Sequence, residues 1–167
     1  AVEMDVQMDE GLKPIYDVIA KIPGTSDQVV VVGNHRDAWT PGAVDPNSGT
    51  AAMLEAARGL GAAVKAGWKP KRTILLCSWD AEEYGLVGST EWAEDNAAML
   101  SSKAVAYFNM DVAVTGPNFG SGGTPSLHDA VREAANMVPE PRKGGMVGPV
   151  WEQRSKAAWA AAEPVNL

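Results

Sequence analysis

The sequence predicts an α/β fold in which helices cover both faces of a mixed, mostly parallel sheet. Three short runs of apolar, β-branched or aromatic residues predict buried strands, because they lack the alternation of a strand exposed on one face. Helical patterns separate consecutive runs, and this strand–helix–strand order is typical of parallel pairing. The three runs are Val29–Val32, Thr73–Cys77 and Ala104–Phe108.

The other elements before the second buried strand have their own signals. Residues Ile15–Ile22 alternate more and stop at a Pro-Gly pair, which predicts an edge or antiparallel strand. We expect the first helix to be capped by Asn47 or Ser48 and to end near Gly67. Its apolar face would carry Met53, Ala57, Leu60 and Val64.

A broken helical stretch, Leu86–Leu100, lies between the second and third buried runs. Beyond Asp111 the composition changes and becomes rich in Gly and Pro. We predict a helix over Leu127–Met137, a Pro/Gly-rich loop over Pro139–Pro149 and an Ala-rich helix over Trp151–Ala162. This last part of the chain carries no further strand signal.

Composition excludes several classes of protein. The 167 residues are 46% hydrophobic, which is enough to bury a core, and no apolar run approaches the ~20 residues needed to cross a bilayer. With 14 basic against 21 acidic residues, the net charge of −7 and the lack of a basic cluster argue against nucleic acid as a partner. The single cysteine, Cys77, excludes intrachain disulfides and lies in an apolar run, so we expect a core residue rather than a nucleophile.

Polar, ionisable residues follow each buried run. Because the carboxyl ends of parallel strands share one edge of a sheet, these residues are expected to converge, together with the loop that enters the first helix. Several carboxylates packed together repel each other unless a divalent cation compensates them. Imidazole and carboxylate donors without thiolates favour Zn²⁺ or a related metal at a catalytic site. The convergent residues are His35, Asp45, Glu82, Glu83 and Asp111.

The adjacent acids Glu82 and Glu83 suggest a division of labour. Neighbouring side chains point about 100° apart on a helix and to opposite sides of a strand, so they rarely bind the same ion. One can bind metal while the other acts as general base on a bound water, as metal-assisted hydrolysis requires. Taken singly, each residue has a plain alternative: a hydrogen-bonded structural histidine, or acids at a solvated helix start. Their coincidence favours the metal site.

Four segments in order resemble the M28-type co-catalytic zinc exopeptidases, most closely the branch of glutamate carboxypeptidase II and the transferrin receptor. The likeness is strong over residues 15–111 and loose over residues 112–167. It implies a three-layer αβα, phosphorylase/hydrolase-like fold, with residues 1–167 forming a partial peptidase domain. The segments are VVVVGNHRDAW (Val29–Trp39), GAVDPNSGTA (Gly42–Ala51), KPKRTILLCSWDAEEYGLVGSTEWAEDN (Lys69–Asn96) and AYFNMD (Ala106–Asp111).

The resemblance implies a metal-binding role for four residues. His35 and Glu83 would be ligands of one zinc, and Asp111 would be a ligand of the other. Asp45 would bridge the two zincs. A complete domain would therefore hold two zinc ions, and this chain one or none.

Further roles are implied for residues around these ligands. Glu82 would be the general base, and Asp37 would orient the histidine from behind. The peptide bond that leads into Pro46 would be cis. Glu91 and Glu94 match residues that hold a structural calcium in the carboxypeptidase branch.

The chain departs from the family pattern at one ligand. The family completes the second zinc site with a histidine far downstream, and the only other histidine here, His128, lies early in a predicted helix, where we expect a surface residue. We therefore expect the first part of a peptidase domain, weak or inactive by itself. Missing strands would leave an exposed sheet edge, which favours self-association or a homodimer.

The resemblance implies a zinc-dependent exopeptidase that hydrolyses peptide bonds, with aminopeptidase or carboxypeptidase action left open. The alternative is a non-enzymatic binding module, because the transferrin receptor branch keeps this fold without its metals. The family likeness also suggests a secreted or periplasmic location, or the extracellular side of a membrane.

Overall fold

The computed structural model describes residues 1–142 and 144–161, with side chains up to residue 158. The chain forms two compact units, one spanning Ala1–Thr115 and one beginning at Gly116. The first unit contains the sheet and every residue proposed for the metal site. The second unit is helical in its described part.

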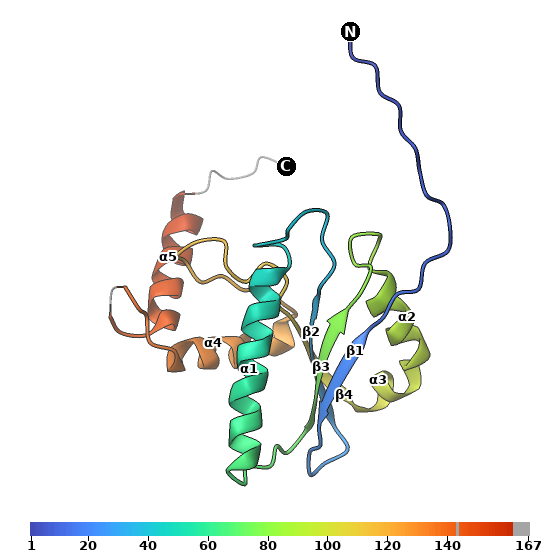
Figure 1. Ribbon diagram of the computed structural model, residues 1–167. Coiled ribbons are helices and arrows are strands. Elements are labelled where there is room, and N and C mark those ends of the chain that lie inside the picture. The colour runs from blue at the N-terminus through green and yellow to red at the C-terminus, as the bar shows by residue number, and fades with distance from the viewer. Residues whose placement is uncertain (143, 162–167) are drawn as a thin grey trace. The chain divides into compact units, whose positions relative to one another are not determined.

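The first unit is built on a four-stranded sheet in the order β1-β3-β2-β4 (Figure 1). The central strand β2 (Val29–His35) pairs in parallel with β3 (Thr73–Trp79) and with β4 (Ala104–Asn109). Strand β1 (Val18–Ile22) pairs antiparallel with β3 and forms one edge. The predicted mixed, mostly parallel sheet with an antiparallel edge strand is confirmed.

Helices cover the two faces of this sheet and make three layers (Figure 1). Helix α1 (Asn47–Lys65) lies on one face, and α2 (Val87–Asp95) and α3 (Ala97–Lys103) lie on the other. The break between α2 and α3 falls at Asn96, inside the stretch predicted to be a broken helix. The predicted three-layer αβα arrangement is confirmed in the described residues of this unit.

The core lies between the sheet and the α2–α3 layer. Partly buried side chains of both helices pack on it, and the rings of Trp79 and Trp92 are 5.2 Å apart. Cys77 is fully buried there, and burial raises the pKa of its thiol to about 12, so the predicted core role is confirmed. The buried cluster consists of Val29, Val31, Leu75, Cys77 and Trp79.

Two expectations about helix starts are wrong. Neither Asn47 nor Ser48 caps α1, because the N-cap residue is Pro46 and both polar residues already lie inside the first turn. The tight loop before the helix puts the Ser48 hydroxyl next to the carbonyl of Val44 instead. The other end is as predicted: α1 stops at Lys65 and Gly67 has a positive φ of 97°.

The second wrong start belongs to α5 (Val147–Ala161), which begins four residues before the predicted Trp151 and includes Pro149. A proline is tolerated in a first helical turn because the N–H groups there have no partner within the helix. Helix α4 (His128–Met137) follows the short helix η1 (Pro125–Leu127), in agreement with the predicted Leu127–Met137. Residue 162, the predicted end of the last helix, lies outside the described residues.

Within the second unit, the rings of Phe119 and Trp151 meet edge to face at 5.1 Å. His128 is exposed and its Nε2 lies 3.1 Å from the carbonyl oxygen of Gly123, which confirms the predicted surface position. Among described residues this unit has an isolated bridge, Pro139 to Met146, in place of a strand.

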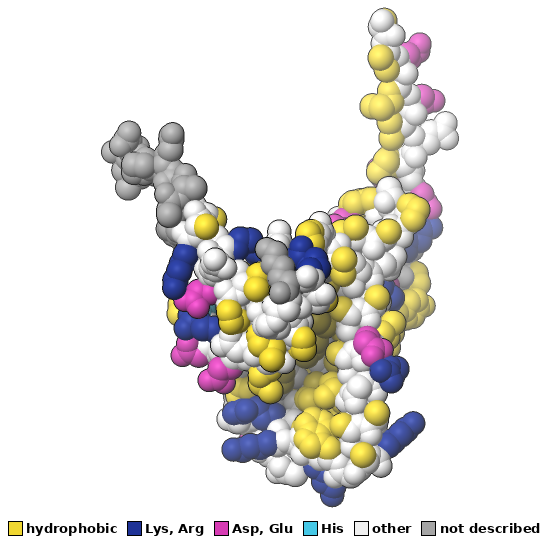
Figure 2. Space-filling view, turned by 90° about the vertical axis from the view of Figure 1, so that its left-hand side faces the viewer, with side chains coloured by type: hydrophobic (Ala, Val, Ile, Leu, Met, Phe, Trp, Pro, Cys, Tyr) yellow, Lys and Arg dark blue, Asp and Glu magenta, His cyan; other side chains and the backbone are white. Residues whose placement is uncertain are grey.

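Apolar side chains remain exposed at several places in the first unit, two of which are continuous segments. Strand β4 was predicted to be buried, but it exposes Val105, Tyr107 and Phe108 because it is an edge of the described sheet. The extended segment before β1 exposes hydrophobic side chains as well, seen as yellow atoms on the arm at the upper right of Figure 2. These N-terminal side chains are Val2, Met4, Val6, Met8 and Leu12. Along the described residues, no helix has both the length and the apolar character that crossing a bilayer requires.

Candidate metal centre

Three of the predicted site residues come together at the carboxyl edge of the sheet. His35 ends β2, Asp45 lies in the loop before α1, and Asp111 follows β4. The Nε2 atom of His35 lies 3.0 Å from Asp111 Oδ1 and 3.2 Å from Asp45 Oδ1, and one donor atom from each residue lies within 4.8 Å of the others. His35 is 3% exposed and Asp45 56%, so the cluster has a buried base and an open side.

Glu82 and Glu83 follow β3 at the same edge, but they differ in how they lie relative to His35. The Oε2 atom of Glu82 lies 3.7 Å from Nε2 of His35. Glu83 is outside the three-residue group, and its backbone N–H donates to Asp37. The residue before the pair, Ala81, is buried and has a φ of 53°, an uncommon conformation for a residue other than glycine.

Asp37 stands behind the histidine, on the side away from the other carboxylates. Its Oδ1 lies 3.3 Å from Nδ1 of His35 and accepts the N–H of Glu82 at 3.0 Å, while Oδ2 accepts the N–H of Glu83 at 3.1 Å. Burial favours the neutral acid, but these backbone donors outweigh it and lower the pKa of Asp37. An ionised carboxylate at Nδ1 leaves Nε2 free to bind a metal, which is the geometry that an orienting role requires.

The electrostatics of the cluster favour added positive charge. Burial and the negative charges of Asp111, Glu83 and Asp37 raise the pKa of Glu82, although His35 opposes them. Burial disfavours the charged form of His35, but Asp111 and Glu82 outweigh it and raise the pKa of the imidazole. Either protons or a metal cation can supply that positive charge. An imidazole nitrogen and two carboxylate oxygens converging on one point fit zinc.

A hydrogen-bond network between β2 and α1 holds the loop that carries Asp45. Asn34 is fully buried, and its Nδ2 donates to the carbonyl of Pro46 and to Oγ1 of Thr50, both at 2.9 Å. The Thr50 hydroxyl in turn donates to the carbonyl of His35 at 3.1 Å. The bond from Asp45 to Pro46 is cis, as the resemblance implied. Neither Asn34 nor Thr50 is among the site residues predicted from the sequence, because Asn34 follows the apolar run Val29–Val32 and looks like a loop residue.

Glu91 and Glu94, expected for calcium, lie three residues apart on α2 and are exposed. Neither belongs to the metal-type cluster found among the described residues, which consists of His35, Asp45 and Asp111. A calcium site there stays a prediction.

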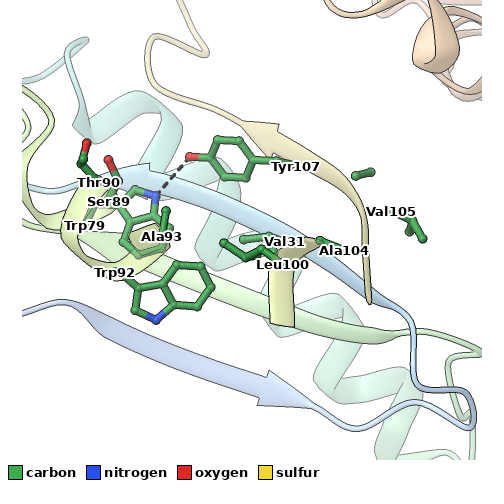
Figure 3. Close-up of a pocket in the computed structure, with 11 residues that line it drawn as sticks. Val31, Trp79, Ser89, Thr90, Trp92, Ala93, Leu100, Ala104, Val105 and Tyr107 are labelled. Carbon is green, nitrogen blue, oxygen red and sulfur yellow. Dashed lines mark hydrogen bonds between the residues drawn. The ribbon is translucent and has the colours of Figure 1, made fainter. Parts of the chain in front are cut away.

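An apolar pocket of about 490 Å³ lies elsewhere in the first unit, between β4 and the α2–α3 layer (Figure 3). Trp79 donates from Nε1 to the hydroxyl of Tyr107 at 3.1 Å across one side of it. No residue of the metal cluster lines this pocket. The metal-type cluster of the unit is therefore at the sheet edge and not in this pocket.

Comparison with known proteins shows the family of the chain. Residues 17–148 match Peptidase family M28, a range that includes every residue of the cluster. The chain belongs to peptidase family M28. It is 58% identical over 129 residues to the probable glutamate carboxypeptidase LAMP1 of Arabidopsis thaliana, covering 76% of this chain and 19% of that protein.

Other M28-related proteins give the same picture. The chain is 50% identical to the probable glutamate carboxypeptidase VP8 of Zea mays, covering 92% of this chain and 22% of that protein. It is 41% identical to the aminopeptidase NAALADL1 of Mus musculus, covering 81% and 19%. The chain thus spans about a fifth of the length of these relatives.

Solved structures agree on the fold. A Peptidase M28 precursor from Shewanella amazonensis aligns with a TM-score of 0.55 at 30% identity, covering 72% of this chain and 27% of that one. A glutaminyl cyclase from an Acidobacteriales bacterium aligns with a TM-score of 0.59 at 24% identity, covering 72% and 46%. The latter likeness concerns the fold alone.

Proposed function

We propose that this chain carries the zinc-binding and proton-transfer residues of an M28 exopeptidase. The observation that supports this most strongly is the approach of two carboxylates to the Nε2 atom of His35, with Asp37 on the other ring nitrogen. Peptides are the substrates that the family implies. The names of the relatives include both carboxypeptidases and an aminopeptidase, so the end from which a peptide is trimmed stays open.

The proposed assignment of ligands is that of two zinc ions in a complete domain. The grouping of donors supports a pairing different from the one that the resemblance implied: His35 and Asp111 would hold one ion, Glu83 would hold the other, and Asp45 would contribute to both. The closeness of Asp45 and Asp111 to the same histidine nitrogen supports a shared site. The second ion needs one more ligand, a histidine from outside these 167 residues. The chain by itself would then hold at most one well-ordered zinc and show weak peptidase activity or none.

Glu82 is the proposed general base. When bound, zinc polarises the scissile carbonyl and makes a water acidic enough to attack at neutral pH. Glu82 takes a proton from that water as its oxygen bonds to the carbonyl carbon, and then passes the proton to the amine nitrogen as the carbon–nitrogen bond breaks. Its carboxylate, 3.7 Å from the imidazole, is close enough to the cluster for this transfer without being one of the three grouped donors.

Substitution of Glu82 in the full-length protein tests this role. We expect Glu82→Gln to keep its zinc, measured by metal analysis, and to lose hydrolysis of a dipeptide by about 10²–10⁴-fold, the usual contribution of general acid–base catalysis. Glu133→Gln is the control, because Glu133 is exposed on α4 in the second unit.

The outcomes separate the alternatives. Unchanged hydrolysis by Glu82→Gln would contradict its role as base. If the full-length protein binds no zinc tightly in calorimetric titration, a non-enzymatic binding module becomes the better reading. Robust turnover by the 167-residue chain alone would overturn the proposal that a further ligand is needed.

A further inference from the structure

The hydroxyl of Ser48 bridges two loops of the first unit. It donates to the carbonyl oxygen of Val44 at 2.6 Å and accepts the backbone N–H groups of Ala113 at 3.1 Å and Val114 at 3.2 Å. Val44 directly precedes Asp45 in the loop before α1. The two amides directly follow the turn at residues 111 and 112, which carries Asp111, the other acid of the cluster.

These three bonds use the whole capacity of the side chain. A hydroxyl has one proton to donate and two lone pairs that accept, so none of its three sites is left for water. Ser48 is partly buried in the first turn of α1. Its hydroxyl oxygen is held between the loop before α1 and the segment after Asp111. An alanine here would remove all three bonds at once and leave the two amides to find water, while the Val44 carbonyl would keep only the backbone N–H of residue 48, at 3.3 Å.

Gly49, the next residue of α1, packs against the backbone of the segment that carries Asp111. A Cβ atom on Gly49 would lie 1.4 Å from the carbonyl oxygen of Met110 and 2.2 Å from that of Asp111. Backbone contact on one side and the Ser48 bonds on the other hold Asp111 to the start of α1. The loop with Asp45 is held to the same turn through Val44.

We propose that Ser48 is a positioning residue that sets the separation of the Asp45 and Asp111 carboxylates, and so the geometry in which they bind a metal. It touches neither the metal nor the substrate. This inference rests on the proposed metal site. Because it acts on two ligands together, its loss should weaken metal binding in the range typical of groups that orient ligands, about 10–100-fold.

Cobalt(II) is the probe for this role, because its visible absorption reports the geometry of its ligands. Titration of the full-length protein with cobalt should give about a tenfold weaker affinity for Ser48→Ala than for the wild type. The visible bands of the bound cobalt should also change. Ser48→Thr keeps the hydroxyl, so it should restore both the affinity and the spectrum.

Ser102→Ala is the matched control. The Ser102 hydroxyl makes the same kind of bond to a carbonyl four residues back, Ala98 at 2.7 Å, but it accepts no loop amide and lies on α3. We expect this variant to bind cobalt as the wild type does. Equal losses in the two serine variants would overturn the positioning role, because a general effect on helices would then explain them.

A ligand variant, His35→Ala, separates this inference from the proposed metal site. If the wild type and His35→Ala bind cobalt alike, the metal site itself is wrong. If His35→Ala loses cobalt while Ser48→Ala keeps the affinity and the spectrum of the wild type, only the positioning role is wrong. Alanine is a good helix former, and a loss of the folded circular-dichroism signal in Ser48→Ala would show a structural role instead.

Discussion

Replacing Gly49 by alanine tests how closely α1 must approach the segment that carries Asp111. A Cβ at this position would lie 1.4 Å from the carbonyl oxygen of Met110. Ordinary carbon–oxygen contacts are about 3.3 Å or longer, so this carbonyl would have to move by about 2 Å. Asp111 is the next residue, and its Oδ1 now lies 3.0 Å from Nε2 of His35. A shift of that size separates the two side chains.

The expected loss of stability follows from two opposed effects. Alanine in a helix is favoured over glycine by about 0.5–1 kcal/mol. Overpacking typically costs about 1–3 kcal/mol, and here the atom struck belongs to the backbone and cannot rotate away. The difference is a net destabilisation of about 0.5–2 kcal/mol, and each kcal/mol lowers the melting temperature by roughly 2–4 °C.

Thermal unfolding followed by circular dichroism, with cobalt titration of the folded protein, measures both effects. Gly59→Ala and Gly61→Ala are matched controls in the same helix, because an added Cβ at either position meets no atom within 4 Å. They should raise the free energy of unfolding by about 0.5–1 kcal/mol. A Gly49→Ala variant that melts no lower than the wild type and binds cobalt equally well would refute the close approach.

Three further predictions concern buried side chains of the first unit. The thiol of Cys77 is buried, with its pKa raised to about 12, so a thiol reagent should modify it only after unfolding, and rapid labelling of the folded chain would contradict this. Because the unfolded thiol ionises near pH 8.5, the contribution of Cys77 to stability is complete below that pH and falls as the pH rises toward about 12. Met53→Ala should cost about 2–5 kcal/mol by opening a cavity under α1. Leu54→Ala, at a residue that is 63% exposed, should change stability by less than about 0.5 kcal/mol, and equal melting temperatures for the two variants would show that α1 packs differently.

The starts of the three strands predicted to be buried could be predicted closely from the sequence. Their burial is as predicted for β2 and β3 but wrong for β4, none of whose residues is buried, because β4 is an edge of the described sheet. Strands β2, β3 and β4 begin at the predicted residues Val29, Thr73 and Ala104, because runs of apolar, β-branched or aromatic residues mark strands. Their ends extend further than predicted. Asn34 and His35 look like loop residues, yet they continue the ladder with β3 up to Trp79 and are buried.

Helix starts were harder to predict, because capping depends on the path of the chain before the helix. Ser48 has the residue type of a cap, but the loop through Pro46 places it inside the first turn, where it bonds to residues far away in sequence. Pro149 likewise looks like a loop residue until the helix is seen to begin just before it. In both cases the backbone conformation just before the helix sets the first helical residue, and local composition does not determine that conformation.

The sequence by itself determined the family, the mostly parallel pairing that brings distant acids to one edge, and the residue types of the metal cluster. These depend on local patterns: apolar runs, the polar residues after them and four ordered motifs. Only the tertiary structure decided which donors meet, with Asp45 and Asp111 against His35 and Glu83 outside that group. It also revealed the contacts of Ser48 with residues 65 and 66 positions away. These contacts join the first turn of α1 to the segment that follows β4, and local sequence patterns do not show which distant segments pack together.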